Sequence, residues 1–324
     1  MSAGPFLHRL QQELGGAIPF ERYMAEALYN ADFGYYASRI RTVGRRGDFS
    51  TMATLDTSLA RAMAKWIHNS RARHIIEVGG GSGQLARDTL KALGWWARRH
   101  ITLHIVEISR PLRDAQQKLL RGFRVAWHET VPSALEAASG EAHIFSNELP
   151  DAFPCRIFEL SAQGWMELHV RIQAGAIYEI LQPCDPPDST ALAYPFPIGQ
   201  RVEVHQSYRH WLNHWAPAWK SGAMLTIDYG DTMPAIYQRR PAGTMRGYAC
   251  HQLLTGHEIL QSPGRIDLTA DVNFTDLEKW GTELGWHTTE HTSLADFLPQ
   301  PLPHQFLGAA QSFRVLEQTA PTAK

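Results

Sequence analysis

Hydrophobic and polar residues follow a repeated unit along this chain: a short apolar run, a polar end and an amphipathic helix. The clearest example runs from Ile75 to Leu90, where Ile76 and Val78 continue a β-branched run that suits a buried strand. A glycine cluster follows, and apolar residues then return at helical spacing. The same plan recurs in TLHIVEIS with SRPLRDAQQKLL, and similar apolar runs lie in FRVAWHE, AHIF and GAMLTIDYG. This repetition predicts an α/β fold with parallel strands.

Other patterns flank the predicted parallel strands. PFERYMAEALYN predicts an amphipathic helix near the N-terminus, and a second helix is expected from Leu59 to Ile67. The alternating runs RIFEL, WMELHVRI and AIYEIL, which begin after Cys155, predict a small antiparallel meander. RVEVHQSYRHWLNHWAPAWK is interpreted as one helix with a packed aromatic face.

The C-terminal part closes the predicted sheet. FTDLEKWGTELGW predicts a helix that Thr275 caps and Gly285 ends. HTTEHTSL and FRVLEQT then predict the last two strands. The expected fold is a seven-stranded, mostly parallel sheet with helices on both faces. We expect a helical or lid segment over residues 1–70 and one domain over 71–324, with insertions at about 155–215 and 231–272.

Composition narrows the possible functions. The 324 residues are 44% hydrophobic and 19% charged, which suits a globular chain with a large core. The formal net charge of −1 gives no indication of a nucleic-acid or membrane partner. The three cysteines form no C-x-x-C pair, so we expect neither a disulfide framework nor a metal site. No run is long enough to span a membrane and no targeting pattern stands at the N-terminus, so we expect a soluble, cytoplasmic protein.

The glycine cluster is the strongest candidate for a ligand site. Gly79, Gly81 and Gly83 lie between a predicted strand and a predicted helix. Glycine permits a sharp turn and a close approach of ligand to backbone, and the helix N-terminus adds a positive dipole end. The pattern therefore predicts a nucleotide-like ligand.

The next strands carry residues that could hold the rest of such a ligand. Glu107 ends the second predicted strand, where a carboxylate can accept hydrogen bonds from both hydroxyls of a ribose. Trp127 and His128 end the third strand and could flank an adenine ring. Packing of Trp127 in the core is an equally good interpretation.

The acid in front of the glycines helps to choose among cofactors. A phosphate-cradling loop needs a lysine that does not follow Gly83, so this class is excluded. A dinucleotide remains formally possible, but Glu77 would lie close to its pyrophosphate and repel it. S-adenosylmethionine has no phosphate and carries an amino group and a sulfonium, so an acid at this position favours its binding. E-x-G-x-G-x-G with Glu107 therefore favours this cofactor.

A second polar group follows the fourth predicted strand. NELPDAFP places Asn147, Glu148 and Asp151 after the apolar run, and ligands in parallel α/β sheets bind beyond the carboxyl ends of strands. Two acids beside a cofactor indicate binding of a cationic group. The alternative is that Asn147 or Asp151 only caps a helix.

Several separated motifs resemble the MidA family, which comprises a mitochondrial complex I assembly methyltransferase and bacterial relatives. The motifs are PFERYMAEALYNADFGYY, GDF with Thr51, IIEVGGGSGQLARDTL, IVEISRPLRDAQ, NELPDAFP, IDYG, GTMRGY and GRIDLTADVNF. Two positions depart from the family pattern. Met52, Ala53 and Thr54 replace its usual Ser-Pro-Glu, and Asp271 stands where the family usually has histidine.

The resemblance implies a class I, Rossmann-like methyltransferase fold and S-adenosylmethionine as cofactor. For the mitochondrial member it also implies symmetric dimethylation of a protein arginine. The predicted cofactor contacts are Glu77, the three glycines, Glu107, Trp127 and Asn147, together with Gly47 and Asp48 of the GDF motif. Glu148 and Asp151 are the predicted catalytic residues, which would hold a protonated guanidinium and direct it at the methyl group.

The sequence alone leaves other functions open. A non-catalytic assembly factor could keep the cofactor pocket, and a small-molecule methyltransferase or an NAD-dependent dehydrogenase could use the same fold. A protein substrate is expected because two large insertions offer more surface than a small acceptor needs. The sequence identifies neither that substrate nor the oligomeric state.

Overall fold

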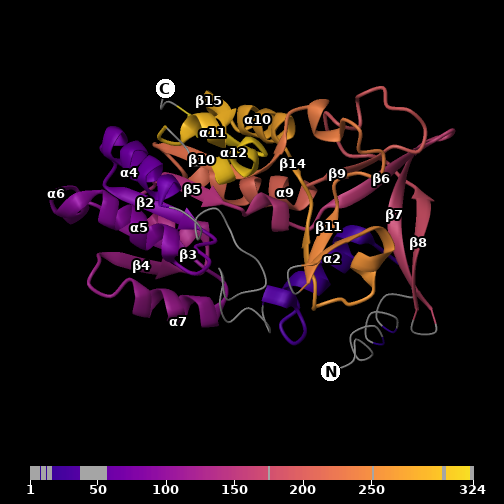
Figure 1. Ribbon diagram of the computed structural model, residues 1–324, viewed down its shortest axis with the longest axis horizontal. Coiled ribbons are helices and arrows are strands. Elements are labelled where there is room, and N and C mark those ends of the chain that lie inside the picture. Colours follow the sequence, from indigo (N-terminus) through magenta and orange to yellow (C-terminus); the bar gives the residue numbers. More distant parts are fainter. Residues whose placement is uncertain are drawn as a thin grey trace. The chain divides into compact units, whose positions relative to one another are not determined.

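The chain divides into two compact units, which are described separately (Figure 1). The structure is a computed structural model that describes residues 8, 12, 17–36, 57–173, 176–249, 252–300 and 304–321. The sheet unit comprises Arg41–Leu149, Trp211–Gly230 and Leu277–Lys324. The insertion unit comprises Met1–Ile40, Pro150–His210 and Asp231–Asp276.

Seven strands of the sheet unit pair in the order β15-β16-β10-β5-β2-β3-β4. The five strands from β10 to β4 run parallel, and β16 runs antiparallel to both β10 and β15. This confirms the predicted mostly parallel sheet. The strands are β2 (His74–Val78), β3 (Thr102–Val106), β4 (Val125–His128), β5 (His143–Asn147), β10 (Ala223–Asp231), β15 (His287–Ser293) and β16 (Phe313–Thr319).

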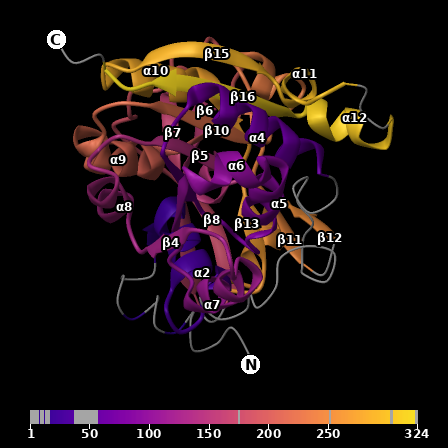
Figure 2. The same cartoon turned by 90° about the vertical axis from the view of Figure 1, so that its left-hand side faces the viewer.

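The central strands of this sheet are buried on both faces. Successive side chains of a strand point to opposite faces, so Ile75 and Ile76 lie on different sides of β2. Both are fully buried, as are Ile144 and Phe145 on β5. Helices of the sheet unit therefore cover both faces (Figures 1 and 2). They are α4 (Ser58–Ser70), α5 (Gln84–Ala92), α6 (Gly94–Arg99), α7 (Arg110–Leu119), α8 (Val131–Ala137), α11 (Leu294–Phe297) and α12 (His304–Gln311).

The order of the strands makes the edge of the sheet at β2 the expected position of a ligand. The chain forms β2 first, adds β3 and β4 on one side, and then crosses to add β5 and β10 on the other side. The strand order reverses between β2 and β5, and parallel α/β sheets bind ligands beyond the carboxyl ends of the strands at such a point. Gly79 follows β2 and Glu148 follows β5, so both lie at this edge.

The insertion unit contains two antiparallel sheets. In one sheet β1, β7, β6 and β9 pair in that order and β8 also pairs with β7, and the other sheet has the order β12-β11-β13. The predicted meander of β6, β7 and β8 is present. The elements are β1 (Ala17–Pro19), α2 (Phe20–Tyr29), β6 (Arg156–Ser161), β7 (Gly164–Gln173), β8 (Ala176–Pro183), β9 (Arg201–Val204), β11 (Arg246–Ala249), β12 (Gln252–Thr255), β13 (Asp267–Thr269) and β14 (Val272–Asn273).

Two helices have residues in both units, and short 3-10 helices complete the chain. The helices are α9 (Gln206–Trp215) and α10 (Phe274–Glu283). The 3-10 helices are η2 (Pro150–Ala152), η3 (Ala216–Ala218), η4 (Ala235–Tyr237) and η5 (Gly256–Leu260). The units join segments on both sides of residue 70, so the expected division into 1–70 and 71–324 stays a prediction.

Two local predictions are wrong. Residues 201–220 do not form one helix, because Arg201–Val204 pairs with β6 as strand β9 before α9 begins. In RVEV the apolar Val202 and Val204 alternate with charged residues, which is the period of a strand. Thr275 does not cap α10. The Asn273 side chain accepts the backbone N–H of Thr275 instead, at 3.1 Å.

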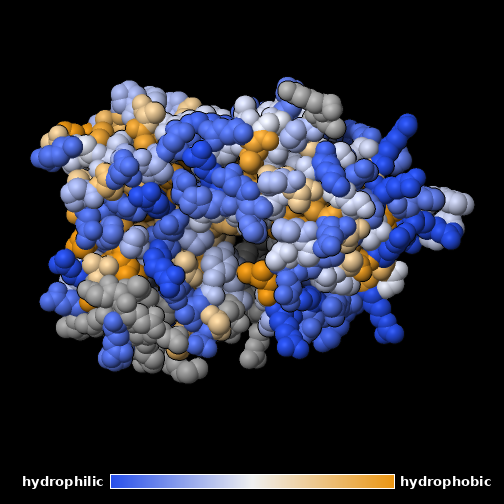
Figure 3. Space-filling model, turned by 180° about the vertical axis from the view of Figure 1, so that it is seen from behind, coloured by the Kyte–Doolittle hydropathy of each residue, from blue (hydrophilic) through white to orange (hydrophobic). Residues whose placement is uncertain are grey.

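In the described parts of the chain, none of the helices has both the length and the apolar character needed to cross a membrane. In Figure 3 hydrophobic residues are scattered among hydrophilic ones on the visible face.

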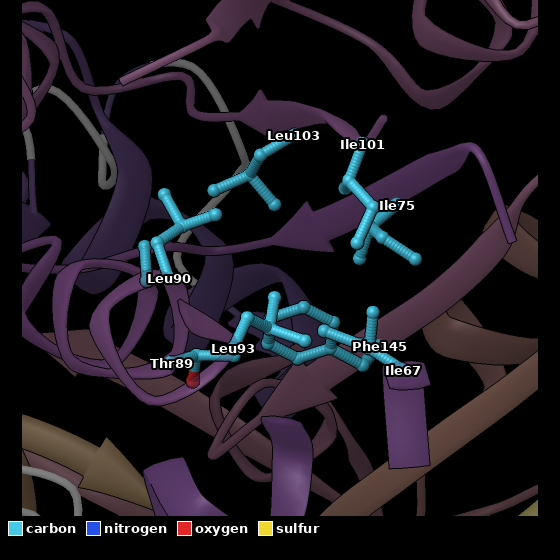
Figure 4. Close-up of a pocket in the computed structure, with 9 residues that line it drawn as sticks. Ile67, Ile75, Thr89, Leu90, Leu93, Ile101, Leu103 and Phe145 are labelled. Atoms are coloured by element: carbon cyan, nitrogen blue, oxygen red, sulfur yellow. The ribbon is translucent and has the colours of Figure 1, made fainter. Parts of the chain in front are cut away.

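One face of the central sheet encloses a small apolar cavity. Side chains of α4, α5, β2, β3 and β5 surround it, together with Leu93 and Ile101, and its volume of about 10 Å³ is at most that of a single water (Figure 4). Thr89 on α5 is the polar residue of this lining. The Thr89 hydroxyl is buried and has no hydrogen-bond partner in the described structure.

Replacing Thr89 with valine should stabilise the protein. Valine has nearly the same shape and removes a buried hydroxyl without a partner, a gain of about 1 kcal/mol or a rise of about 2–4 °C in the unfolding midpoint. Thr89→Ser is the matched control, because it keeps the hydroxyl, removes a methyl group and should lower the midpoint. Calorimetry measures both changes, and a midpoint for Thr89→Val below that of the wild type would contradict the prediction.

Candidate cofactor and active site

The glycine turn after β2 has a backbone that other residues rarely adopt. Gly79, Gly81 and Gly83 have φ angles of +73°, +50° and +76°. A Cβ at Gly79 would lie 2.9 Å from the Leu149 side chain, whereas a Cβ at Gly81 would meet no atom of the described residues within 4 Å. The turn therefore presents Gly81 to open space, where a ligand can approach the backbone, at the N-terminus of α5.

Glu77 places a buried acid beside this turn. Its side chain is only 3% exposed, and the Oε2 atom has no hydrogen-bond partner in the described structure. Burial, together with the nearby charge of Glu107, raises the pKa of Glu77 to about 8. A buried carboxylate is costly unless a positive group compensates it. Glu77 is therefore suited to a cationic ligand and unsuited to a phosphate.

Glu107 follows β3 and is held from two sides. Its Oε1 atom accepts the backbone N–H of Ser109 at 2.9 Å, and its Oε2 atom accepts a hydrogen bond from the Gln116 amide at 3.2 Å. Burial raises the pKa of Glu107, and these two hydrogen bonds oppose the shift. The arrangement keeps a carboxylate in place at the position predicted for contact with a ribose.

Gln116 joins the predicted site residues, and the sequence interpretation missed it. It lies on α7 and is fully buried. Its Nε2 atom also donates to the carbonyl of Gly81, and its Oε1 atom accepts the indole N–H of Trp127 at 3.1 Å. One signal could have found it: Gln116 takes a position of the apolar face of α7, midway between the buried Leu112 and Leu120.

Asn147 and Glu148 lie at the end of β5, next to the glycine turn. The Asn147 amide donates to Glu148 Oε1 at 3.1 Å, and Glu148 has a left-handed backbone with φ of +54°. Such a conformation costs free energy for a residue other than glycine and is often found at functional sites. β5 pairs with β2, and Leu149 packs on Gly79, so the predicted catalytic Glu148 lies beside the predicted cofactor turn.

Asp151 belongs to the insertion unit and has its own polar surroundings there. It is buried, and its Oδ2 atom accepts the Thr269 hydroxyl at 2.7 Å. Burial raises the pKa of Asp151, while the hydrogen bond from Thr269 and the charge of Arg246 oppose that shift. A cation of the protein thus already lies near this acid.

Asp271 pairs with two arginines of the same unit. Its Oδ1 atom accepts from Arg246 Nη1 at 2.5 Å, and its Oδ2 atom accepts from Arg240 Nη1. The backbone N–H of Asp271 donates to the Thr244 hydroxyl. Asp271 therefore anchors arginines of its own chain.

The predicted contacts Gly47 and Asp48 lie outside the described residues.

Comparison with known proteins identifies the family. The S-adenosyl-L-methionine-dependent methyltransferase family matches residues 58–292. The chain belongs to this family. The match includes the glycine turn, both buried acids and the polar group after β5. The resemblance seen in the sequence and the prediction of S-adenosylmethionine as cofactor are thereby confirmed.

Similar proteins agree with this assignment. The mitochondrial protein arginine methyltransferases NDUFAF7 of Danio rerio and Homo sapiens are 27% and 26% identical to this chain, over 82% and 85% of it and 68% of each relative. A Burkholderia thailandensis protein solved with S-adenosyl-homocysteine bound aligns over 98% of this chain and 91% of its own, with 28% identity and a TM-score of 0.81. A native structure from the same organism has a TM-score of 0.78 over the same shares, with 26% identity. The class I methyltransferase fold is thus confirmed.

The expected cellular location is wrong. The similar NDUFAF7 proteins are named mitochondrial, which contradicts the cytoplasmic location expected from the sequence. That expectation depended on the lack of a recognisable targeting pattern, and such a lack carries no positive information about a compartment.

The raised pKa of Glu77 predicts how stability without cofactor depends on pH. Between the ordinary pKa of 4.5 and a pKa of about 8, the unfolded protein releases the proton of Glu77 while the folded protein keeps it, so the wild type loses stability progressively as pH rises through that range. Glu77→Gln removes the titrating group. From about pH 5 to about pH 8, the unfolding midpoint of the variant should therefore rise relative to that of the wild type. The affinity of the variant for the cofactor should be lower than that of the wild type.

Glu136→Gln is the matched control for this comparison, because Glu136 is exposed on α8. Its midpoint should follow that of the wild type across the pH range. A constant difference between Glu77→Gln and the wild type at all pH values would contradict the prediction.

Proposed function

We propose that this methyltransferase transfers a methyl group from S-adenosylmethionine to the guanidinium of a protein arginine. The relatives named protein arginine methyltransferases support this acceptor. The observation that carries the proposal is the position of Glu148, a carboxylate held in a left-handed backbone directly beside the glycine turn. A cation-binding group at that place suits a guanidinium acceptor.

The residues at the edge of the sheet fit the cofactor in three parts. The orphaned Oε2 of Glu77 suits the cationic methionine part, Glu107 suits the ribose hydroxyls, and Trp127 suits the adenine ring. The open face of Gly81 leaves room between them. When bound, S-adenosylmethionine supplies a methyl group on a positively charged sulfur. We also assign contacts to Asn147, Gly47 and Asp48.

The acceptor sets the demands on the remaining acids. A guanidinium has a pKa above about 12 and is protonated, so it must be held by negative groups and oriented with one nitrogen toward the methyl group. Orientation of two reacting groups can supply several kcal/mol of the barrier. Glu148 and Asp151 are proposed for this role. Glu148 is the stronger candidate, because it directly follows β5 beside the glycine turn.

An experiment that identifies the methylated product tests the proposal. The purified protein is incubated with labelled S-adenosylmethionine and a lysate that lacks this protein, and mass spectrometry locates the label. We expect it on arginine side chains of a protein. Label found only on small molecules or on other residue types would overturn the proposed acceptor.

Glu148→Gln should keep cofactor binding and lose transfer. The amide has the same shape but no charge to hold a guanidinium, so the rate should fall on the order of a hundredfold, as when one electrostatic contact to a transition state is removed. Titration calorimetry measures binding and label incorporation measures transfer. Glu141→Gln is the control, because Glu141 is exposed and precedes β5 at its other end. Unchanged transfer by Glu148→Gln would remove this residue from catalysis.

Gly81→Val should abolish cofactor binding. The branched side chain would occupy the open face of the turn, and the positive φ adds strain. Gly94→Val is a close control, since Gly94 also has a positive φ of +74° and open space around its Cβ but lies at the start of α6. Strain alone should affect both variants, so loss of affinity in both or in neither would contradict the assigned position of the site.

A further inference from the structure

Gln116 connects four parts of the cofactor site through one side-chain amide. It lies on α7, accepts from Trp127 at the end of β4, and donates to Gly81 of the glycine turn and to Glu107 after β3. The three distances between donor and acceptor atoms are 3.1, 2.8 and 3.2 Å. A buried amide without hydrogen bonds would be destabilising, and here each of its two polar atoms has a partner.

The orientation of this amide is determined by its partners. The indole N–H of Trp127 can only donate, so it requires the carbonyl oxygen of Gln116 on its side. The NH₂ group must then face the carbonyl oxygen of Gly81 and the carboxylate of Glu107. The carbonyl oxygen can only accept a hydrogen bond, and so can the carboxylate when it is ionised. No other orientation of the amide satisfies all three partners.

The glycine turn packs directly on the same side chain. A Cβ added at Gly83 would lie 3.1 Å from the Cγ atom of Gln116, and a Cβ added at Gly80 would lie 3.3 Å from its Nε2 atom. Gln116 is therefore in contact with the turn and in hydrogen-bond contact with Glu107. A change at this residue must alter the positions of both.

We propose that Gln116 is a positioning residue that makes the site selective for a ribose. It fixes the Glu107 carboxylate so that its remaining acceptor sites face the ribose hydroxyls, and it fixes Trp127 against the adenine. Gln116 itself need not touch the cofactor. This inference rests on the proposed function only through the cofactor and is independent of the methyl acceptor.

The hydrogen bond from Gln116 also favours the ionised form of Glu107. Burial raises the pKa of this acid, and the amide N–H opposes the shift. An ionised carboxylate accepts hydrogen bonds from both hydroxyls, whereas a neutral acid gives up one acceptor site to its own proton. Removal of the amide therefore weakens the contact of Glu107 with the ribose in two ways: the carboxylate is less well positioned, and its ionised form is less favoured.

The test compares two ligands that differ by one hydroxyl. Titration calorimetry measures the affinities of the wild type for S-adenosylhomocysteine and for its 2′-deoxyribose analogue. A hydrogen bond to a charged group contributes about 1.5–3 kcal/mol, so the wild type should prefer the ribose form by about 10- to 100-fold. Gln116→Met removes the amide at nearly constant length and should reduce this ratio to within a few fold of one.

A second variant and a control variant distinguish loss of the ribose preference from misfolding and from nonspecific effects of a substitution. Gln116→Leu also removes the donating amide in a side chain of similar size, so it should also lose the preference if Gln116→Met does not fold. Gln117→Met changes the next, exposed residue of α7 and should keep the wild-type ratio. If Gln116 only stabilised the fold, its replacement would weaken the binding of both ligands equally and leave the ratio of their affinities unchanged.

The outcomes separate this inference from the proposed function. An unchanged ratio in both Gln116 variants, or no preference for the ribose form in the wild type, overturns the role of Gln116. If the Gln116 variants lose the preference for the ribose form but no protein arginine is methylated, the proposed methyl acceptor is wrong and the positioning role of Gln116 is supported. A wild type that binds neither ligand overturns both.

Discussion

Two buried carboxylates, Glu77 and Glu107, impose the constraint on which the site depends. Each is nearly fully buried, and each raises the free energy of the folded protein when ionised. Glu107 receives two hydrogen bonds from the protein, but Glu77 keeps an oxygen without a partner in the described structure. Ionisation of the buried Glu77 thus raises the free energy of the folded protein, and a cationic cofactor can offset this increase. The same cost disfavours an anionic ligand, which supports the proposed place of S-adenosylmethionine, and not of a phosphate-bearing nucleotide, at this turn.

The sheet topology determines where this constraint acts. The reversal of strand order between β2 and β5 brings the glycine turn and Glu148 to one edge, and the pairing of β2 with β3 brings Glu77 toward Glu107. The three glycines adopt a positive φ with little strain, but the left-handed backbone of Glu148 and the two buried acids are local costs at that edge. The apolar core on both faces of the sheet offsets them. The site is therefore a strained polar edge supported by a buried sheet, as is common where function competes with stability.

Particular residues show how far the sequence predicted this structure. The strand from Ile75 to Val78, its glycines and the following helix were correctly predicted, because β-branched runs, glycines and helical periodicity act over a few residues. RVEV was wrongly joined to α9, since only its pairing with β6 makes it a strand. Gln116 was missed because its partners come from three other elements. The two arginines that Asp271 holds lie far from it in the chain, so no local pattern indicated that pairing.

The sequence by itself therefore determined the fold class, the glycine turn after β2 and the acids at the ends of the neighbouring strands. Each of these depends on short-range properties: side-chain shape, the freedom of glycine at positive φ, and the period of apolar residues. Only the tertiary structure decided which acid has hydrogen-bond donors and which does not, how Gln116 orients its amide, and which arginines occupy Asp271. These features depend on desolvation and hydrogen-bond geometry, and both are set by atoms that folding brings together from distant parts of the chain.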